Sequence, residues 1–330
     1  MVCFRQSMRS LQDQTTGASK RASSKSIPKC AALITAKWSN IQQSGHYGHL
    51  HTWSVVGRHP VLTVLYSRVI PRWSRPLAEQ ISDPGTISDA EWAIRTDLAA
   101  CYRLFVKYGW TDLIFTHLSA RVPGTSDQYL INPYGLLFEE VTASSLLKVS
   151  FAGDVITGDY PYNDAGHAIH SAILQARPDV NAVLHSHTRA GMTVSTMQCG
   201  LLPLTQQANE VMANVAYHAY DIAVGAEEEC ERLGSDIADK HAMIMHNHGL
   251  LTCAGTIAEA FYLMYTLENA CKVQVDALAS GQVLHYTKPS AQAALSAYGK
   301  VNPEKQSRSS RKAWPAMLRM LDANDPSYKN

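Results

Sequence analysis

Two short histidine clusters are the residues of this chain most able to do chemistry. His185 and His187 flank one serine and follow the apolar run Val180–Leu184, and a second pair, His246 and His248, follows another short apolar run. Alternate residues of a strand share a face, so each pair can direct both imidazoles at one point. Neutral imidazole is a preferred ligand of zinc, and catalytic zinc sites keep three protein ligands beside an open position. The pattern predicts one metal site built from two distant segments.

Three of these histidines form the predicted ligand set. His185 and His187 supply two ligands from one strand. We favour His248 as the third, because the adjacent Gly249 allows the backbone to approach closely. His246 shares that face by the same spacing and remains a competing candidate. Three neutral ligands leave a divalent ion its full charge, with which it can polarise a carbonyl or hydroxy-acid oxygen.

Three helices are expected to position these clusters. Ser88 and Glu91 form a capping box that predicts a helix start, and Gly109 is a natural stop. A second helix is expected over about residues 165–176. The most periodic segment runs from Ile257 to Val275, with apolar residues every three or four positions. The apolar face of this last helix is expected to cover the sheet.

Short apolar runs between the helices predict the strands of that sheet. Besides the two runs that end in histidines, Leu113–Phe115, Tyr129–Ile131 and Leu146–Val149 are bounded by turn residues. Helices that flank a mostly antiparallel or mixed sheet around one core give an α/β/α architecture. We therefore predict a single core domain.

The charge distribution divides the chain. Residues 1–75 hold eleven of the 29 Lys and Arg but only one of the 28 Asp and Glu. We predict a basic, poorly ordered extension over residues 1–82, a metal-binding domain over 83–285 and a C-terminal arm or tail over 286–330. An acid-poor, Arg- and Ser-rich N-terminus fits an organelle transit peptide, with a disordered tail or an over-extended gene model as alternatives.

Composition excludes several classes of function. The body beyond the extension is acidic, so no nucleic-acid partner is expected. The seven cysteines are odd in number and form no CxxC pair, which favours a reducing compartment and a cytoplasmic location over a disulfide framework. No run of about eighteen apolar residues is present, so no membrane partner is expected either.

Five motifs occur in order along the chain: Thr116–Gly124, Ile131–Gly135, Ala176–Asp179, Val183–His187 and Asn247–Leu250. Taken together, they resemble the class II aldolase/adducin family over Leu113–Gly281. The resemblance implies an α/β/α fold with a central, mostly antiparallel sheet, and a homo-oligomer, often a tetramer. It also implies a divalent metal, usually zinc, on three histidines that match His185, His187 and His248, with Mn, Co or Fe as alternatives.

The chain departs from the sugar-phosphate aldolases of that family. Their Ser-Ser-Glu segment, which holds phosphate and supplies the catalytic acid/base, matches Asp164, Ala165 and Gly166. The glutamate is absent, and an aspartate beside a phosphate would repel it. Their phosphate-cradling Gly-Asn pair matches Thr116 and His117. The chain therefore resembles the adducin-like branch more than the sugar-phosphate branch.

Two residues are candidates to replace the missing acid/base. His167 follows the vacated position and titrates near neutrality, although it is equally a polar residue at a helix end. Glu210 is the second candidate, with a solvated helix residue as its alternative. The matching motifs make His117, Tyr134 and Gly135 the expected substrate-binding residues.

The predicted function is a metal-dependent carbon–carbon lyase, a decarboxylase or aldolase. Its substrate would be a small non-phosphorylated hydroxy or keto acid that reacts through a metal-stabilised enolate. Decarboxylation is favoured, because it needs no base to deprotonate a substrate hydroxyl. An Fe(II)-dependent oxygenase ranks second, since three histidines without a carboxylate match the usual iron triad poorly. A non-catalytic, adducin-like scaffold ranks third, because all three histidines are retained.

Overall fold

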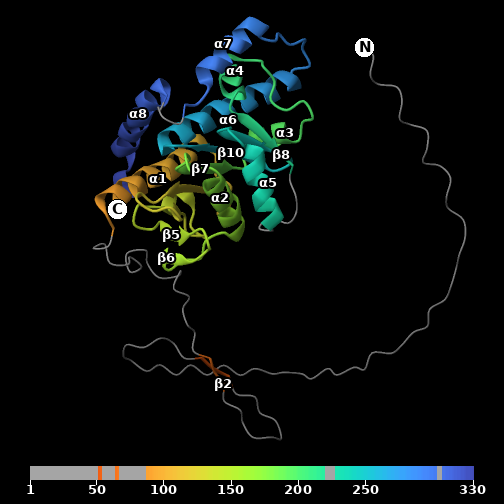
Figure 1. Ribbon diagram of the computed structural model, residues 1–330. Coiled ribbons are helices and arrows are strands. Elements are labelled where there is room, and N and C mark those ends of the chain that lie inside the picture. Colours follow the sequence, from red (N-terminus) through yellow and green to blue (C-terminus); the bar gives the residue numbers. More distant parts are fainter. Residues whose placement is uncertain (1–50, 54–63, 67–86, 220–226, 303–306) are drawn as a thin grey trace, which may run out of the picture. The chain divides into compact units, whose positions relative to one another are not determined.

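A computed structural model of the chain describes residues 51–53, 64–66, 87–219, 227–302 and 307–330 (Figure 1). The chain divides into two units, residues 1–68 and 69–330. In the first unit, β1 (His51–Trp53) and β2 (Val64–Tyr66) pair in antiparallel fashion. Apart from these two strands, the extension predicted over residues 1–82 lies outside the described residues.

The second unit is built on one eight-stranded sheet. Its strand order is β6-β5-β4-β3-β7-β10-β9-β8, and every described pair is antiparallel except β8 with β9. The predicted mostly antiparallel α/β/α architecture is confirmed. The strands are β3 (His117–Arg121), β4 (Gln128–Ile131), β5 (Leu147–Ser150), β6 (Val155–Thr157), β7 (Ala182–Ser186), β8 (Val215–His218), β9 (Ala242–Met245) and β10 (Gly249–Ala254).

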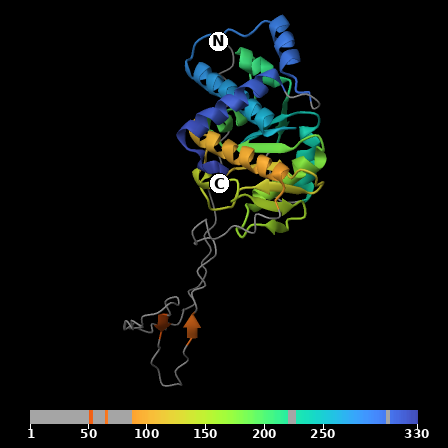
Figure 2. The same cartoon turned by 90° about the vertical axis from the view of Figure 1, so that its left-hand side faces the viewer.

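Helices cover both faces of this sheet, and Figure 2 views it from the side of α1 and α8. The helices α1, α6 and α8 pack with Leu184 of β7 in one apolar cluster, whereas α2 and α5 pack with Val183 in another. His185 lies two residues beyond Val183 and so faces the α2 side. The helices are α1 (Asp89–Tyr108), α2 (Asp164–Ala176), α3 (Arg189–Ser195), α4 (Gln206–Met212), α5 (Glu227–Ile237), α6 (Ile257–Ala279), α7 (Pro289–Gly299) and α8 (Arg308–Asn324).

The helix boundaries follow the signals in the sequence. The Ser88 hydroxyl accepts the Glu91 N–H at the start of α1, and Gly109 ends the helix in the left-handed conformation at φ 69°. Asn163 caps α2 and Thr256 caps α6 in the same way. All three predicted helices are confirmed, and α6 extends four residues beyond the expected Val275.

One predicted strand is wrong. Leu113–Phe115 forms no strand, and only an isolated bridge joins Asp112 to Phe115. Leu113 and Thr116 have positive φ values of 49° and 68°, which a continuous strand does not accommodate. The segment is a turn that leads directly into His117 at the start of β3.

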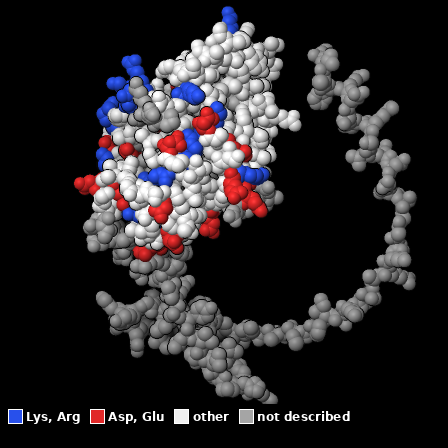
Figure 3. All heavy atoms as spheres, in the orientation of Figure 1, with Lys and Arg blue, Asp and Glu red and all other residues white. Residues whose placement is uncertain are grey.

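The expected C-terminal arm is folded. Trp314 and Leu321 of α8 are buried in the cluster that α1 and α6 share, and the η5 turn (Pro326–Lys329) buries Tyr328 beside them. Figure 3 shows Lys and Arg gathered at the upper left, over α8. The polar composition of this segment therefore belongs to one face of a docked helix. Within the described ranges, no helix combines the length and apolar character needed to cross a membrane.

Candidate metal centre

Three histidines converge at one end of the two central strands. His185 is near the end of β7, His187 follows that strand, and His248 lies in the β9–β10 turn. The Nε2 atoms of His185 and His187 are 2.9 Å apart, as are those of His187 and His248. His246 is not in this group, and its N–H donates to the carbonyl of His218. Of the two alternatives in the sequence, the structure brings His248 to the pair.

The β9–β10 turn delivers His248 through two special backbone positions. Asn247 adopts the left-handed conformation at φ 57°, which asparagine tolerates better than most residues. A Cβ atom at Gly249 would collide with the carbonyl oxygen of Ser186. Glycine therefore permits the close backbone approach predicted from the sequence, and this approach carries His248 to His187.

Neighbouring acceptors fix the tautomers of two histidines. The Nδ1 atom of His185 donates to the Leu250 carbonyl at 2.9 Å, and that of His187 donates to the Asp112 carboxylate at 3.0 Å. A carbonyl or carboxylate oxygen can only accept here, so in each neutral ring the proton lies on Nδ1 and Nε2 presents a lone pair. Lone pairs facing each other at this distance repel unless a cation lies between them. The donor set therefore fits a divalent metal that prefers imidazole, such as zinc.

Burial keeps His185 and His248 of this cluster neutral. Desolvation, followed by the neighbouring His248 and His117, lowers the pKa of His185 well below its usual value. Desolvation and then His187 lower the pKa of His248 to about 4. Since metal ions bind the deprotonated ring, protons compete weakly for these two nitrogens at neutral pH.

A second histidine cluster lies against the first. His117 pairs with His185 across β3 and β7, and their rings stack with centroids 5.2 Å apart. Its Nδ1 is 2.8 Å from Nε2 of His170 on α2, whose Nδ1 is 2.5 Å from the Ser119 hydroxyl. His117 and Ser119 are two residues apart on β3, so both face α2. Burial lowers the pKa values of His117 and His170 well below the usual range.

The ring of His117 occupies the space next to Gly166. A Cβ atom at this position would lie 2.5 Å from Cδ2 of His117. No side chain larger than hydrogen fits there without moving the ring. The sequence did not predict the partnership of His117 with His170 and Ser119, although two polar residues at i and i+2 on a buried strand signal a polar partner across the face.

The family of the chain follows from comparison with known proteins. The family model described as the Class II Aldolase and Adducin N-terminal domain matches residues 96–275, which include every residue of the two histidine clusters. The chain belongs to the class II aldolase and adducin family.

Individual relatives carry both aldolase and adducin names. A protein of Pseudomonas aeruginosa named as an aldolase class 2 protein is 48% identical over 245 residues, 74% of this chain and 94% of that protein. Rat alpha-adducin is 42% identical over 203 residues, 60% of this chain but 28% of its own length. The crystal structure of an aldolase II superfamily protein from Pseudomonas syringae is 39% identical, covers 76% of this chain and all of that one, and superposes with a TM-score of 0.71.

Three other residues predicted for the site lie away from the three converging nitrogens. His167 of α2 bonds through Nδ1 to the Tyr129 hydroxyl at 2.6 Å. The N–H of Tyr134 donates to the carbonyl of Pro161, and Gly135 follows in a positive-φ turn after β4. The hydrogen bonds and ring contacts of these residues link them to neighbours in the sheet and turn. The proposed catalytic role of His167 and the substrate roles of Tyr134 and Gly135 stay predictions.

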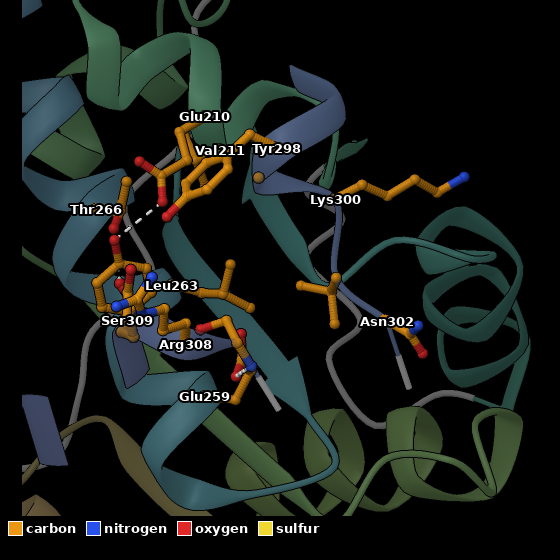
Figure 4. Close-up of a pocket in the computed structure, with 14 residues that line it drawn as sticks. Glu210, Val211, Glu259, Leu263, Thr266, Tyr298, Lys300, Asn302, Arg308 and Ser309 are labelled. Atoms are coloured by element: carbon orange, nitrogen blue, oxygen red, sulfur yellow. Dashed lines mark hydrogen bonds between the residues drawn. The ribbon is translucent and has the colours of Figure 1, made fainter. Parts of the chain in front are cut away.

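Glu210 belongs to a different pocket (Figure 4). It lies on α4, where its carboxylate accepts a hydrogen bond of 2.9 Å from the Tyr262 hydroxyl of α6. The same pocket is lined by Glu259, Tyr298 and Arg308, and none of the histidines of the two clusters is among the residues that line it. The structure therefore does not bring Glu210 to the candidate metal centre.

Proposed function

We propose that this chain is a metal-dependent carbon–carbon lyase that acts on a small, non-phosphorylated hydroxy or keto acid. The observation that carries the proposal is the convergence of three imidazole nitrogens from His185, His187 and His248, two of them with their lone pairs fixed by outer hydrogen bonds. Membership of a family that contains aldolases supports the lyase class. Zinc is the proposed ion, with Mn, Co or Fe as alternatives.

The protein's own groups would prepare the site for this reaction. A bound divalent ion would polarise a substrate oxygen and stabilise negative charge on the adjacent carbon. His185 and His187 would hold the ion, and Leu250 and Asp112 would keep both rings in the binding tautomer. Burial of His185 would limit the water around the reacting oxygen.

Decarboxylation is the reaction that the geometry favours. In aldol cleavage a base must remove the proton of a substrate hydroxyl, whereas loss of carbon dioxide needs no such base. Position 166 is glycine, and a carboxylate side chain there would have to displace the His117 ring that fills the adjoining space. Glu210, the other candidate carboxylate, lines a separate pocket. Neither position 166 nor Glu210 thus supplies a carboxylate base to the described site, and Asp112 is engaged by the His187 ring, which supports the reaction that needs no such base.

A non-catalytic, adducin-like scaffold is the second candidate. Rat alpha-adducin is 42% identical to this chain over 203 residues, which supports it. Metal content separates the two proposals, since a scaffold has no need of a bound ion.

The deciding experiment begins with metal analysis of the purified protein. We expect close to one divalent ion per chain, and release of carbon dioxide from a member of a panel of hydroxy and keto acids. Each acid is assayed with and without oxygen, because turnover that requires oxygen would point to the oxygenase alternative. Substoichiometric metal, with no gain of activity after addition of Zn, Mn, Co or Fe, would overturn the lyase proposal and favour the scaffold.

We also propose that the chain assembles with copies of itself, with a tetramer as the expected form. Leu113 and Phe115 support this proposal, because the turn that leads to β3 exposes 70% and 42% of these apolar residues. The mass of the purified protein by light scattering tests it, and a monomer at micromolar concentration would contradict it.

A further inference from the structure

His117 uses only one of its two ring nitrogens within the described part of the chain. The residue is 4% exposed, and its Nδ1 pairs with His170. Its Nε2 has no hydrogen-bond partner among the described residues, yet it is not one of their fully buried, unpaired polar atoms. The Nε2 atom therefore opens onto accessible space. Because the ring stacks on His185, that space adjoins the candidate metal centre.

The direction of the hydrogen bonds decides what Nε2 offers. In one arrangement the Ser119 hydroxyl donates to Nδ1 of His170, and the Nε2–H of His170 donates to Nδ1 of His117. The proton of neutral His117 then lies on Nε2. In the reverse arrangement His117 donates from Nδ1, His170 donates to Ser119, and Nε2 of His117 is an acceptor.

Burial of Ser119 distinguishes the two arrangements. Ser119 is 0% exposed, and within the described part of the chain its hydroxyl has no hydrogen-bond partner other than His170. In the reverse arrangement the serine proton would have no acceptor, and an unsatisfied buried donor costs about 1–3 kcal/mol. In the forward arrangement every buried donor of Ser119 and His170 is satisfied. The serine thus selects the tautomer of a ring that it does not touch.

We infer that Ser119 and His170 are positioning residues that hold His117 as an Nε2–H donor, and that this N–H binds an anionic substrate oxygen next to the metal. The ligand class is a small carboxylate or the oxyanion formed from it. Its link to catalysis rests on the function proposed above, whereas the tautomer itself does not. Gly166 contributes by leaving room for the ring, since its Cβ would lie 2.9 Å from Nε2.

This assignment also explains why a neutral histidine suits the position. A fixed N–H stabilises negative charge without giving up its proton, as the donors of an oxyanion hole do. It binds one oxygen of a planar carboxylate and lacks the several donors that a phosphate group requires. The site would therefore select carboxylates over phosphorylated acids of similar size.

Nitrogen NMR of the zinc-loaded protein with labelled histidine tests the tautomer directly. Two-bond proton–nitrogen spectra identify which ring nitrogen carries the proton in each histidine. We expect both His117 and His170 to be protonated on Nε2 in the unmodified chain. A proton on Nδ1 of His117 would overturn the inference, whatever the enzyme turns over.

A matched pair of serine variants tests the cause. Ser119→Ala removes the selecting hydroxyl, so both tautomers of His117 become populated. Ser171→Ala is the control, because Ser171 is also buried and adjoins His170 in the sequence, but its hydroxyl donates to the Ala168 carbonyl and to no histidine among the described residues. We expect mixed signals in the first variant and the original spectrum in the second. Identical, unmixed spectra from both variants would refute the role of Ser119.

Binding of glycolate to the zinc-loaded protein, measured by calorimetry, tests the ligand class. We expect His117→Phe, which keeps a ring but loses the donor, to weaken binding by about tenfold or more. Ser119→Ala should weaken it only about twofold, because roughly half of the rings keep the donor tautomer. Phosphoglycolate should bind more weakly than glycolate. Equal glycolate affinity in His117→Phe and the unmodified protein would rule out the contact even where the tautomer is as expected.

Discussion

The two neighbouring histidine clusters differ in where their ring nitrogens point. In the cluster of His185, His187 and His248 the Nε2 atoms face one another, and backbone or carboxylate acceptors hold Nδ1 of the first two. In the second cluster His117 and His170 form a chain of hydrogen bonds that ends at a serine. Converging lone pairs suit a cation, whereas a chain fixes the position of a proton. Histidines on the adjacent strands β3 and β7 thus have different chemistry, because their hydrogen-bond partners differ.

The largest difference between the clusters should appear when one histidine of each is removed. We expect His185→Ala to lower zinc affinity by more than about 100-fold. Loss of a ligand should cost more than loss of a residue that only hydrogen-bonds to a ligand, for which the effect is about 10–100-fold. His170→Asn should leave zinc affinity nearly unchanged, because the described hydrogen bonds of His170 go to His117 and Ser119 and to none of the three ligands. Zinc titration with a competing chelator measures both.

His246→Ala serves as the matched control for His185→Ala. This histidine lies in the same turn as His248 but donates its backbone N–H to His218 instead of joining the converging nitrogens. Loss of zinc from His246→Ala as severe as from His185→Ala would contradict the ligand assignment.

Asp112 tests whether outer partners define the first cluster. Its carboxylate accepts a hydrogen bond of 3.0 Å from Nδ1 of His187. Asp112→Ala therefore leaves the tautomer and the orientation of the His187 ring unconstrained. We expect zinc affinity to fall about 10–100-fold. Asp127→Ala is the control, because Asp127 is an exposed aspartate in another loop. Equal zinc affinity in both variants would show that the hydrogen bond to His187 has no role in metal binding.

Periodicity explains why part of the first cluster could be predicted. Strand alternation determines that His185 shares a face with Val183, and glycine after His248 marks a close approach, so both features are local. Asp112 is different. It lies in a turn whose left-handed residues, Leu113 and Thr116, carry no glycine or asparagine signal. The sequence consequently predicts a strand there and gives no sign that the Asp112 carboxylate is a partner of His187.

The second cluster could not be predicted from the sequence for a different reason. The contact of His117 with His170 depends on how α2 lies across the sheet, which helical periodicity alone does not determine. The same limit applies to Glu210, since the local sequence cannot tell that Tyr262 of α6 is its partner. Packing between elements decides these contacts, whereas the capping residues and apolar repeats determine the elements themselves.

Gly166→Ala should disturb the second cluster with a smaller effect. The new Cβ would lie 2.5 Å from the His117 ring, and the strain should lower the free energy of unfolding by about 1–3 kcal/mol. Alanine gains up to about 1 kcal/mol in helix propensity over glycine, which offsets part of this loss. Urea denaturation measures the balance. In a His117→Ala background the strain should vanish and Gly166→Ala should become neutral or stabilising, and a cost that persists would show that another contact causes it.

The last effect, the pH dependence of stability, is shared by both clusters. Burial lowers the pKa of His248 from 6.5 to about 4, and lowers those of His185 and His170 well below 6.5. Between these values the unfolded chain binds more protons than the folded one, so the unfolding free energy of the metal-free protein should fall as the pH drops from 6.5 toward 4. Each such histidine contributes at most about 1.4 kcal/mol per pH unit. His170→Asn removes one of them, so urea denaturation at pH 6.5 and 5 should give a shallower dependence than in the unmodified chain. An unchanged slope would mean that His170 does not stay neutral in the folded protein, and that its hydrogen bonds differ from those of a neutral chain.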